Sequence, residues 1–233
     1  MSLQHSIREY NVSGCKMDIE ILYEDQYLLT CIKPAGVLSE DGGMPDMLSA
    51  QLGVKRIYCV HRLDKDVGGV MIFAKDGKTA ALLSEAISAH KAKKEYLLIC
   101  QGAPEENTGT FSDLLYHDKQ KNKTYVVKKE RKGVKDAELQ YEVLASDIDA
   151  NISLVRAALK TGRSHQIRVQ FASRKMPLVG DGKYGSSIKS PKIALWSYRY
   201  AFAHPVTGET IMTAKTPPIE NSWTAFEDVI KAI

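Results

Sequence analysis

Three short segments combine acidic, basic and aromatic side chains in patterns that could do chemistry. The first is His61-Arg62-Leu63-Asp64, which lies between two apolar runs typical of buried strands. Charged groups wedged between buried strands need partners, because an unpaired buried charge is strongly destabilising. The aspartate is therefore either a structural turn residue or a functional carboxylate, and the local sequence leaves both possibilities open.

The second and third segments carry the matching basic and aromatic groups. In Lys93-Lys94-Glu95-Tyr96 a basic pair leads into a strand, and a tyrosine at such a position is more often core than catalytic. The third segment runs from Thr161 to Arg168 across an expected strand-to-helix turn. Backbone N–H groups at such a turn, together with Arg163 and Arg168, favour an anion. Structural ion pairing is the alternative there.

Positive charge is concentrated in one stretch, residues 119–135, which we call the basic segment. It holds eight basic residues and one acid, whereas the other 216 residues carry 24 basic and 27 acidic side chains. Such a run can neutralise phosphates and release counterions, which favours a nucleic-acid partner. The competing interpretation is a solvated hairpin whose lysines only keep it soluble.

Composition excludes several other classes of protein. The chain has 233 residues, of which 44% are hydrophobic and 26% charged, close to the globular average. It has no run of ~20 apolar residues and no apolar signal core near its start, so neither a membrane partner nor secretion is expected. Four widely spaced cysteines predict reduced thiols and a cytoplasmic location. The histidine spacing predicts no metal site, and the stretch 180–185 lacks both nucleotide-binding patterns.

Many short strands and few helices must position these segments. A hairpin is expected over 19–23 and 27–33, and further strands over 56–60, 70–74, 96–100, 124–127, 137–143, 152–159, 193–202 and 210–214. Helices are expected over 47–52, from an Asp76 cap through Lys91, and over 164–174. This order predicts an α+β fold with a mixed, largely antiparallel sheet core and flanking helices. We expect a polar N-terminal arm over 1–17 and one domain over 18–233.

Taken together, the segments resemble the RluA-type pseudouridine synthases. The resemblance rests on His61-Arg-Leu-Asp64, on Lys94-Glu-Tyr96, on 161–168 (Thr-Gly-Arg-Ser-His-Gln-Ile-Arg) and on 180–185 (Gly-Asp-Gly-Lys-Tyr-Gly). The motifs at 33–36 (Lys-Pro-Ala-Gly) and 204–208 (His-Pro-Val-Thr-Gly) are similar to the family as well. The matches are in order along nearly the whole chain. The resemblance implies the catalytic fold of that family, with a central cleft.

It also implies an activity and a set of roles. Uridine in RNA would be isomerised to pseudouridine without a cofactor, by a flipped-out base and an essential Asp64. Arg168 would pair with that carboxylate, and Tyr96 would stack on the base. Residues implied in RNA binding are His61, Arg62, Lys94, Arg163, His165 and, from the basic segment, Lys128, Lys129, Arg131 and Lys132. The RNA would be ribosomal or transfer RNA, and the enzyme a monomer.

Departures from the family pattern keep alternatives open. Val67-Gly68-Gly69 stands where the family usually has Thr-Ser/Thr-Gly, so two hydroxyls are missing beside the expected active site. About 18 residues precede the first strand, too few for the N-terminal RNA-binding module of many relatives. One alternative is an RNA-binding homologue that has lost catalysis. Another is a glycoside hydrolase that uses Asp64 with Asp66 or Asp181 as paired carboxylates.

Overall fold

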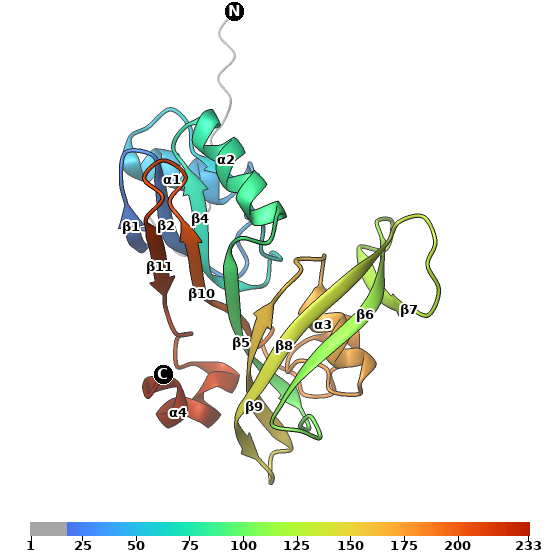
Figure 1. Ribbon diagram of the computed structural model, residues 1–233. Coiled ribbons are helices and arrows are strands. Elements are labelled where there is room, and N and C mark those ends of the chain that lie inside the picture. Colours follow the sequence, from blue (N-terminus) through green and yellow to red (C-terminus); the bar gives the residue numbers. More distant parts are fainter. Residues whose placement is uncertain (1–17) are drawn as a thin grey trace, which may run out of the picture.

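The computed structural model describes residues 18–233, so the arm predicted over 1–17 lies outside the described residues (Figure 1). The strands are β1 (Ile21–Glu24), β2 (Leu28–Lys33), β3 (Tyr58–Cys59), β4 (Gly68–Ala74), β5 (Lys93–Gln101), β6 (Thr108–Asp118), β7 (Lys123–Val127), β8 (Val134–Asp147), β9 (Ile152–Leu159), β10 (Leu195–Ala203) and β11 (Thr210–Ala214). The helices are α1 (Met44–Leu52), α2 (Gly77–Ser88), α3 (Gln166–Ser173) and α4 (Glu227–Lys231), with short 3₁₀ turns η1 (Gly182–Tyr184) and η2 (Asn221–Phe226).

All described strands join one branched sheet. Its order is β1-β2-β4-β10-β5-β9-β8-β6-β7, with β11 added to β10 and β3 to β4. Within residues 18–233 the pairing of β4 with β10 is parallel and the other pairings are antiparallel. The prediction of an α+β fold with a largely antiparallel sheet is confirmed.

The sheet forms two halves that meet along β10 and β5 (Figure 1). One half holds β1, β2, β4 and β11 with α1 and α2, and the other holds β6 to β9 with α3. At the junction the Ser197 hydroxyl donates to the Val70 carbonyl, 2.9 Å away, which ties β10 to β4. Every residue of β4 is buried, because this strand lies between neighbours and is covered on both faces.

Local sequence accounts for most element ends. The Asp76 carboxylate accepts from the Thr79 amide at 2.9 Å, the cap that the sequence predicted for α2. The helix ends at Ser88 rather than Lys91, because His90 adopts a left-handed conformation with φ 57°. Likewise α3 begins at Gln166 rather than Ser164, because His165 has φ 53°. The strand expected over 56–60 shortens to the two residues of β3.

The long strand β6, which carries the far half of the sheet, was not predicted from the sequence. Its buried side chains are Phe111 and Leu115, four residues apart, so the alternation that indicates a strand is missing. Between them, the half-buried Asp113 accepts from Arg174 at 2.9 Å and from Gln170 at 2.8 Å. A polar side chain on this strand is thus satisfied by α3 and its end, a partnership that no local pattern reports.

The main core packs between the sheet and α3, with Leu98, Val155 and Phe171 fully buried. A second cluster gathers Trp196 and Tyr198 against the C-terminal turn and α4, which the sequence did not predict. The described cysteines are free thiols, and Cys15 lies outside the described residues. Within residues 18–233 no helix is long and apolar enough to cross a membrane.

Candidate active site

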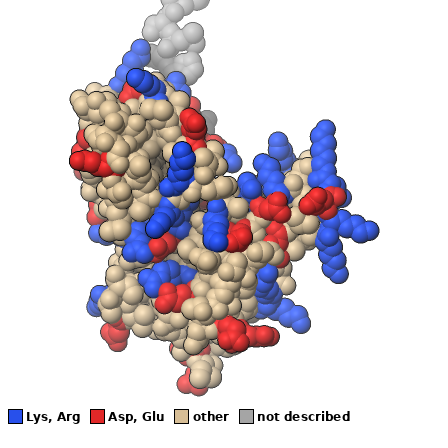
Figure 2. Space-filling view, in the orientation of Figure 1, with Lys and Arg blue, Asp and Glu red and all other residues tan. Residues whose placement is uncertain are grey.

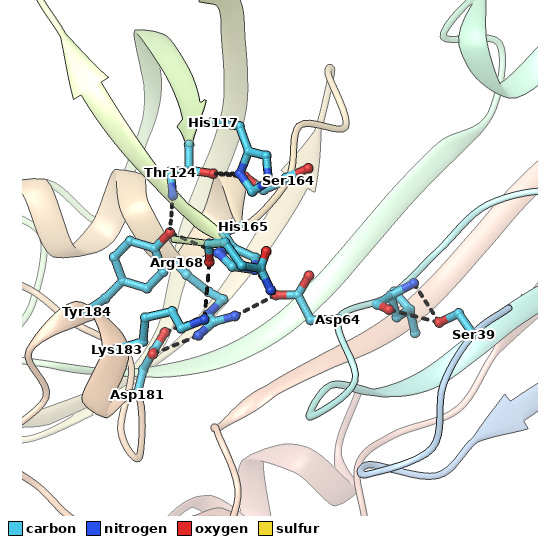
Figure 3. Close-up of polar contacts among 12 residues, drawn as sticks. Ser39, Asp64, His117, Thr124, Ser164, His165, Arg168, Asp181, Lys183 and Tyr184 are labelled. Carbon is cyan, nitrogen blue, oxygen red and sulfur yellow. Dashed lines mark hydrogen bonds and ion pairs between the residues drawn. The ribbon is translucent and has the colours of Figure 1, made fainter. Parts of the chain in front are cut away.

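A cleft of about 890 Å³ opens where the two halves of the sheet meet. The three sequence motifs, far apart along the chain, all reach it: Asp64 and Arg62 from the loop before β4, Tyr96 and Lys94 from β5, and His165 and Arg168 from the start of α3. Figure 3 shows Asp64 facing Arg168 and His165 across this cleft. The structure therefore brings together the site residues that the sequence singled out.

The loop that carries Asp64 is fixed on both sides of that residue. Before it, Leu63 donates its amide to the Ser39 hydroxyl (3.0 Å) and accepts from it at its carbonyl (2.8 Å). After it, the buried Lys33 ammonium donates to the Lys65 carbonyl at 3.0 Å. The Asp64 carbonyl itself accepts from the Val67 amide at 3.0 Å and closes a turn. The backbone of Asp64 is thus held in place before any substrate arrives.

Lys33 belongs to a motif that sequence analysis noticed but gave no role. Burial lowers the pKa of Lys33 to about 8, although the charges of Asp66 and Asp64 act to raise it. Its second hydrogen bond goes to the Pro34 carbonyl, 2.9 Å away. Lys33 therefore holds the Asp64 loop through the Lys65 carbonyl and also places positive charge near the Asp64 carboxylate.

The unusual Val67-Gly68-Gly69 turn has a structural reason. A Cβ on Gly68 would lie 2.6 Å from the Trp196 ring, and one on Gly69 would lie 2.3 Å from the Ser197 carbonyl oxygen. Gly69 also has φ +120°, which favours glycine. A serine at position 68 would clash with the Trp196 ring on β10. The large Trp196 side chain therefore explains why glycine replaces the hydroxyl residue that the family usually has at this position. The turn itself remains closed.

Arg168 joins two carboxylates from different parts of the chain. Its Nη1 donates to Asp64 Oδ2 at 2.7 Å, while Nε and Nη2 donate to Asp181 at 2.7 and 2.9 Å. The Arg168 side chain is 6% exposed and that of Asp181 is 1% exposed, whereas Asp64 is 27% exposed toward the cleft. Burial acts to lower the pKa of Arg168, but the two carboxylates more than offset it and raise the pKa. Arg168 is therefore a fixed cation that leaves Asp64 accessible from one side.

Asp181 is a partner of Arg168 that the sequence analysis did not identify. Both of its oxygens accept from Arg168, so it orients the guanidinium and is not free to act as an acid or a nucleophile. The geometry therefore speaks against a glycoside hydrolase that pairs Asp64 with Asp181, while the pairing of Asp64 with Asp66 stays an open alternative. The sequence did hold a signal for Asp181: it lies in the glycine-rich stretch 180–185, which is also typical of loops that bind a ligand.

Tyr96 and His61 form the inner wall of the cleft. Burial, with a smaller contribution from the charge of Asp64, raises the pKa of Tyr96 to about 12, so the phenol keeps its proton at neutral pH. His61 accepts from the Ile72 amide at Nε2 (3.0 Å), and its Nδ1 lies 3.2 Å from the Tyr200 hydroxyl, with the two rings stacked. Burial lowers the pKa of His61 to about 3. Both nitrogens are used inside the fold, so His61 builds the wall of the cleft, and its RNA contact stays a prediction.

The basic residues expected to bind RNA differ in how free they are. Arg62 lies at the rim, 65% exposed, and pairs with Glu40 at 3.1 Å. Arg163 is held by its Nε, which donates to the Asp136 carbonyl at 2.8 Å. The side-chain ammonium of Lys94 has no hydrogen-bond or ion-pair partner within residues 18–233, and burial lowers its pKa. Of these three cationic side chains in the cleft, Lys94 is the one that no protein group in the described part of the chain holds.

His165 contacts two side chains of the site, Asp64 and Tyr184. Its Nε2 is 3.7 Å from Asp64 Oδ2, and its Nδ1 is 2.9 Å from the Tyr184 hydroxyl. Neither Tyr184 nor its partner Thr124 was given a role from sequence. Gln166 braces the same loop by accepting from the Arg163 amide (3.0 Å) and from the Thr161 hydroxyl (2.8 Å).

The basic segment covers the β6–β7 turn, β7 and the loop into β8, beside the cleft. Lys and Arg side chains project into solvent from this end of the molecule (Figure 2). Its residues Lys128, Lys129, Arg131 and Lys132 are exposed, and Arg131 stacks over the Tyr116 ring at 4.6 Å. Asn122, at the start of this hairpin, accepts at its carbonyl from Lys183 Nζ at 3.1 Å, so the segment is joined to the wall of the site.

Comparison with known proteins gives a consistent picture. A family model described as RNA pseudouridylate synthase matches residues 27–173. An uncharacterized RNA pseudouridine synthase of Synechocystis is 36% identical, over 89% of this chain and 68% of its own length. A ribosomal large subunit pseudouridine synthase D of Xanthomonas campestris is 34% identical, over 86% of this chain and 66% of its own length.

Solved structures agree at the level of the fold. Human RNA pseudouridylate synthase domain containing 1 superposes with a TM-score of 0.75 at 20% identity, covering 94% of this chain and 96% of that chain. Human RNA pseudouridylate synthase domain containing 4 gives a TM-score of 0.73 at 22% identity, with 91% and 93% covered. The overall fold is therefore one that solved proteins share.

Proposed function

The chain belongs to the RNA pseudouridylate synthase family, and we propose that it isomerises particular uridines of a structured RNA with Asp64 as its essential carboxylate. Membership makes it an RNA uridine isomerase. The observation that supports the role of Asp64 is its position: it is the carboxylate of the Arg168 pair that remains accessible from the cleft.

The reaction exchanges one bond of the sugar for another. The bond from C1′ of ribose to N1 of uracil breaks, the base turns, and C1′ bonds to C5. The proton displaced from C5 leaves and N1 gains one, so no oxidant or reductant is consumed. Asp64 would act as an anion, either by attack on the sugar or by removal of a sugar proton. Both routes need a charged carboxylate at a fixed place, which the 2.7 Å bond from Arg168 supports.

Tyr96 would handle the base. It is buried at the wall of the same cleft as Asp64, where its ring can stack on uracil. Because its pKa is raised, the Tyr96 hydroxyl is protonated at neutral pH, and in this form it would take part in proton transfer during the reaction.

The uridine must leave its stack to reach Asp64, since the glycosidic bond is inaccessible inside a helix. Arg62 is suited to hold the opened RNA. Its ion pair with Glu40 joins two exposed side chains, and such pairs contribute about 0–1 kcal/mol, so Arg62 can leave it readily. Lys94 would meet a phosphate or the base inside the cleft, and the basic segment would hold the RNA backbone outside it.

Ribosomal RNA is the substrate class to test first. The relatives named ribosomal large subunit pseudouridine synthase D include chains of Xanthomonas, Xylella and Zymomonas. Transfer RNA remains the second class that the family motifs admit.

Pseudouridine mapping across total RNA tests the proposal. RNA from cells that have the gene is compared with RNA from cells that lack it, and from cells complemented with wild type or Asp64→Asn. We expect one or a few sites to vanish with the gene and to return with wild type only. A map that does not depend on the gene, while the purified protein still binds RNA, would instead favour the homologue without catalysis.

A further inference from the structure

Three elements of the fold meet at one hydroxyl group, that of Tyr184 in η1. The Thr124 amide on β7 donates to it at 2.8 Å, and His165 Nδ1 at the start of α3 lies 2.9 Å from it. Figure 3 shows the Tyr184 oxygen between Thr124 and His165, with Asp64 beyond the imidazole. Both His165 and Tyr184 are far from Thr124 in sequence, so the meeting is a product of the tertiary fold.

The hydrogen bond from Thr124 fixes one role of the Tyr184 hydroxyl, that of acceptor. The Thr124 N–H occupies one lone pair of the Tyr184 oxygen, which leaves the phenolic proton to be donated. Burial raises the pKa of Tyr184, so the hydroxyl keeps that proton at neutral pH. The acceptor assigned to that proton is His165 Nδ1, 2.9 Å from the hydroxyl oxygen.

The direction assigned to the bond between Tyr184 and His165 also sets the tautomer of His165. Burial lowers the pKa of His165, as do the charges of Arg168, Lys183 and His117, against the opposing effect of Asp64. The ring is therefore neutral and carries one proton. With Nδ1 as an acceptor, that proton is on Nε2, which faces Asp64 Oδ2 at 3.7 Å. The reverse tautomer would turn a lone pair toward the carboxylate.

Backbone conformation and bracing indicate that this orientation is held rather than incidental. His165 has a left-handed backbone with φ 53°, which is uncommon for a non-glycine residue. Thr124, 1% exposed, braces the neighbouring residue: its hydroxyl donates to the Ser164 carbonyl at 2.7 Å and lies 3.0 Å from His117 Nδ1. Strand β7, which lies within the basic segment, is thereby hydrogen-bonded to Ser164, the residue before His165.

We propose that Tyr184 is a positioning residue, which directs the Nε2 proton of His165 toward Asp64 and makes that direction depend on the placement of β7. The inference rests on the proposed function, in which Asp64 is the reacting carboxylate. An Nε2–H aimed at Asp64 Oδ2 leaves the other carboxylate oxygen for the substrate.

Tyr184→Phe in the full chain tests the role, because it removes only the hydroxyl. We expect the single-turnover rate at saturating RNA to fall about 10- to 100-fold, the range for a misplaced catalytic group, with the RNA Kd unchanged. Tyr198→Phe is the matched control: it removes a hydroxyl that donates to the Ile233 carbonyl (3.2 Å), away from the cleft, and should keep the wild-type rate. A wild-type rate in Tyr184→Phe, or a loss confined to Kd, would overturn the proposal.

Nitrogen NMR of His165 gives a readout that a merely structural role would not move. The His165→Gln variant assigns the signal. In wild type we expect unprotonated Nδ1 and protonated Nε2, and in Tyr184→Phe a mixture of tautomers. A wild-type ring protonated at Nδ1 overturns the inference whether or not the protein makes pseudouridine. A chain that makes none, with the expected tautomer, refutes the proposed function and leaves this assignment standing.

A double-mutant cycle completes the test. If Tyr184 acts through His165, then Tyr184→Phe with His165→Gln should lose no more turnover than His165→Gln alone. His165→Gln by itself should lose at least as much as Tyr184→Phe. Additive losses, or a wild-type rate in His165→Gln, would overturn the proposal.

Discussion

The floor of the cleft and the basic segment beside it handle charge in opposite ways. In the floor, by which we mean Asp64, Arg168 and Asp181, three charged groups share three hydrogen bonds of 2.7–2.9 Å, and two of the groups are almost fully buried. In the basic segment, eight cations are spread over 17 residues and most of them are exposed.

The difference separates positioning from attraction. A buried network has one geometry, and removing one member leaves the others unpaired in a poorly solvated place. Exposed charges act additively on a polyanion and are screened by salt. We therefore expect changes in the floor to affect turnover and changes in the basic segment to affect binding.

The largest effect should come from Asp64→Asn, which keeps the shape of the side chain and removes its charge. Pseudouridine formation should fall by at least ~10³-fold, comparable to the loss of other catalytic groups, while the RNA Kd stays near the wild-type value. Single-turnover assays and filter binding on one RNA measure both. Appreciable turnover by the purified variant would break the comparison at its most important residue.

Arg168→Met should come next and should affect both stability and rate. It leaves the Asp181 carboxylate, 1% exposed, without its cation, at a cost of about 3–5 kcal/mol in the free energy of unfolding. Turnover should fall about 10²-fold or more, because Asp64 loses its partner.

Adding Asp181→Asn separates these two effects. The double variant leaves no unpaired buried charge at position 181, so part of the unfolding free energy should return, but turnover should not. Urea unfolding and single-turnover rates on the two variants decide the point. If turnover recovers together with stability, then Arg168 only holds the fold.

Tyr96→Phe should have a smaller effect, confined to the chemical step. The ring remains to stack on the base, so the RNA Kd should barely change. Turnover should fall about 10²-fold if the hydroxyl donates a proton, the lower end of the range for general acids. A rate equal to wild type would restrict Tyr96 to stacking.

The basic segment should show the reverse pattern. Changing Lys128, Lys129, Arg131 and Lys132 to Gln should weaken RNA binding and reduce the slope of log K against log salt by roughly 0.7–0.9 for each phosphate that is no longer neutralised. Turnover at saturating RNA should be retained. A matched variant with Gln at Lys78, Lys189, Lys215 and Lys231, exposed and outside the segment, should keep the wild-type slope. Equal slopes in both variants would show that the segment is only a solvated face.

The last effect concerns the inner wall and is a change in how stability depends on pH. The folded pKa of His61 is about 3, below the usual 6.5, so between these values the unfolded chain binds a proton that the folded chain does not. The free energy of unfolding should therefore fall as pH drops from about 6.5 toward 3. His61→Gln should be less stable than wild type at neutral pH. Its unfolding free energy should also depend less steeply on pH, by the contribution of about one bound proton. Parallel pH curves for the two proteins would contradict the buried, neutral imidazole.

Local patterns were enough to predict much of the frame. The strand over 152–159 and the strand over 210–214 were placed to the residue, because apolar runs and turn residues mark both ends. The Asp76 cap was readable since one side chain and one amide three residues on make it. The family was readable too, because motifs keep their order and spacing along a chain.

Tertiary structure alone decided how the site is assembled. Nothing local relates Asp181 to Arg168, or Tyr184 to Thr124, because the partners lie 13 and 60 residues apart and meet only when α3, η1 and β7 pack together within one half of the sheet. His61 shows the converse: it stands in the most suggestive motif, yet folding turns both its nitrogens inward. The sequence determined which chemical groups the protein carries. Which of them face the cleft and which hold its walls was decided by burial, since a charged or polar group removed from water must take whichever partner the fold brings to it.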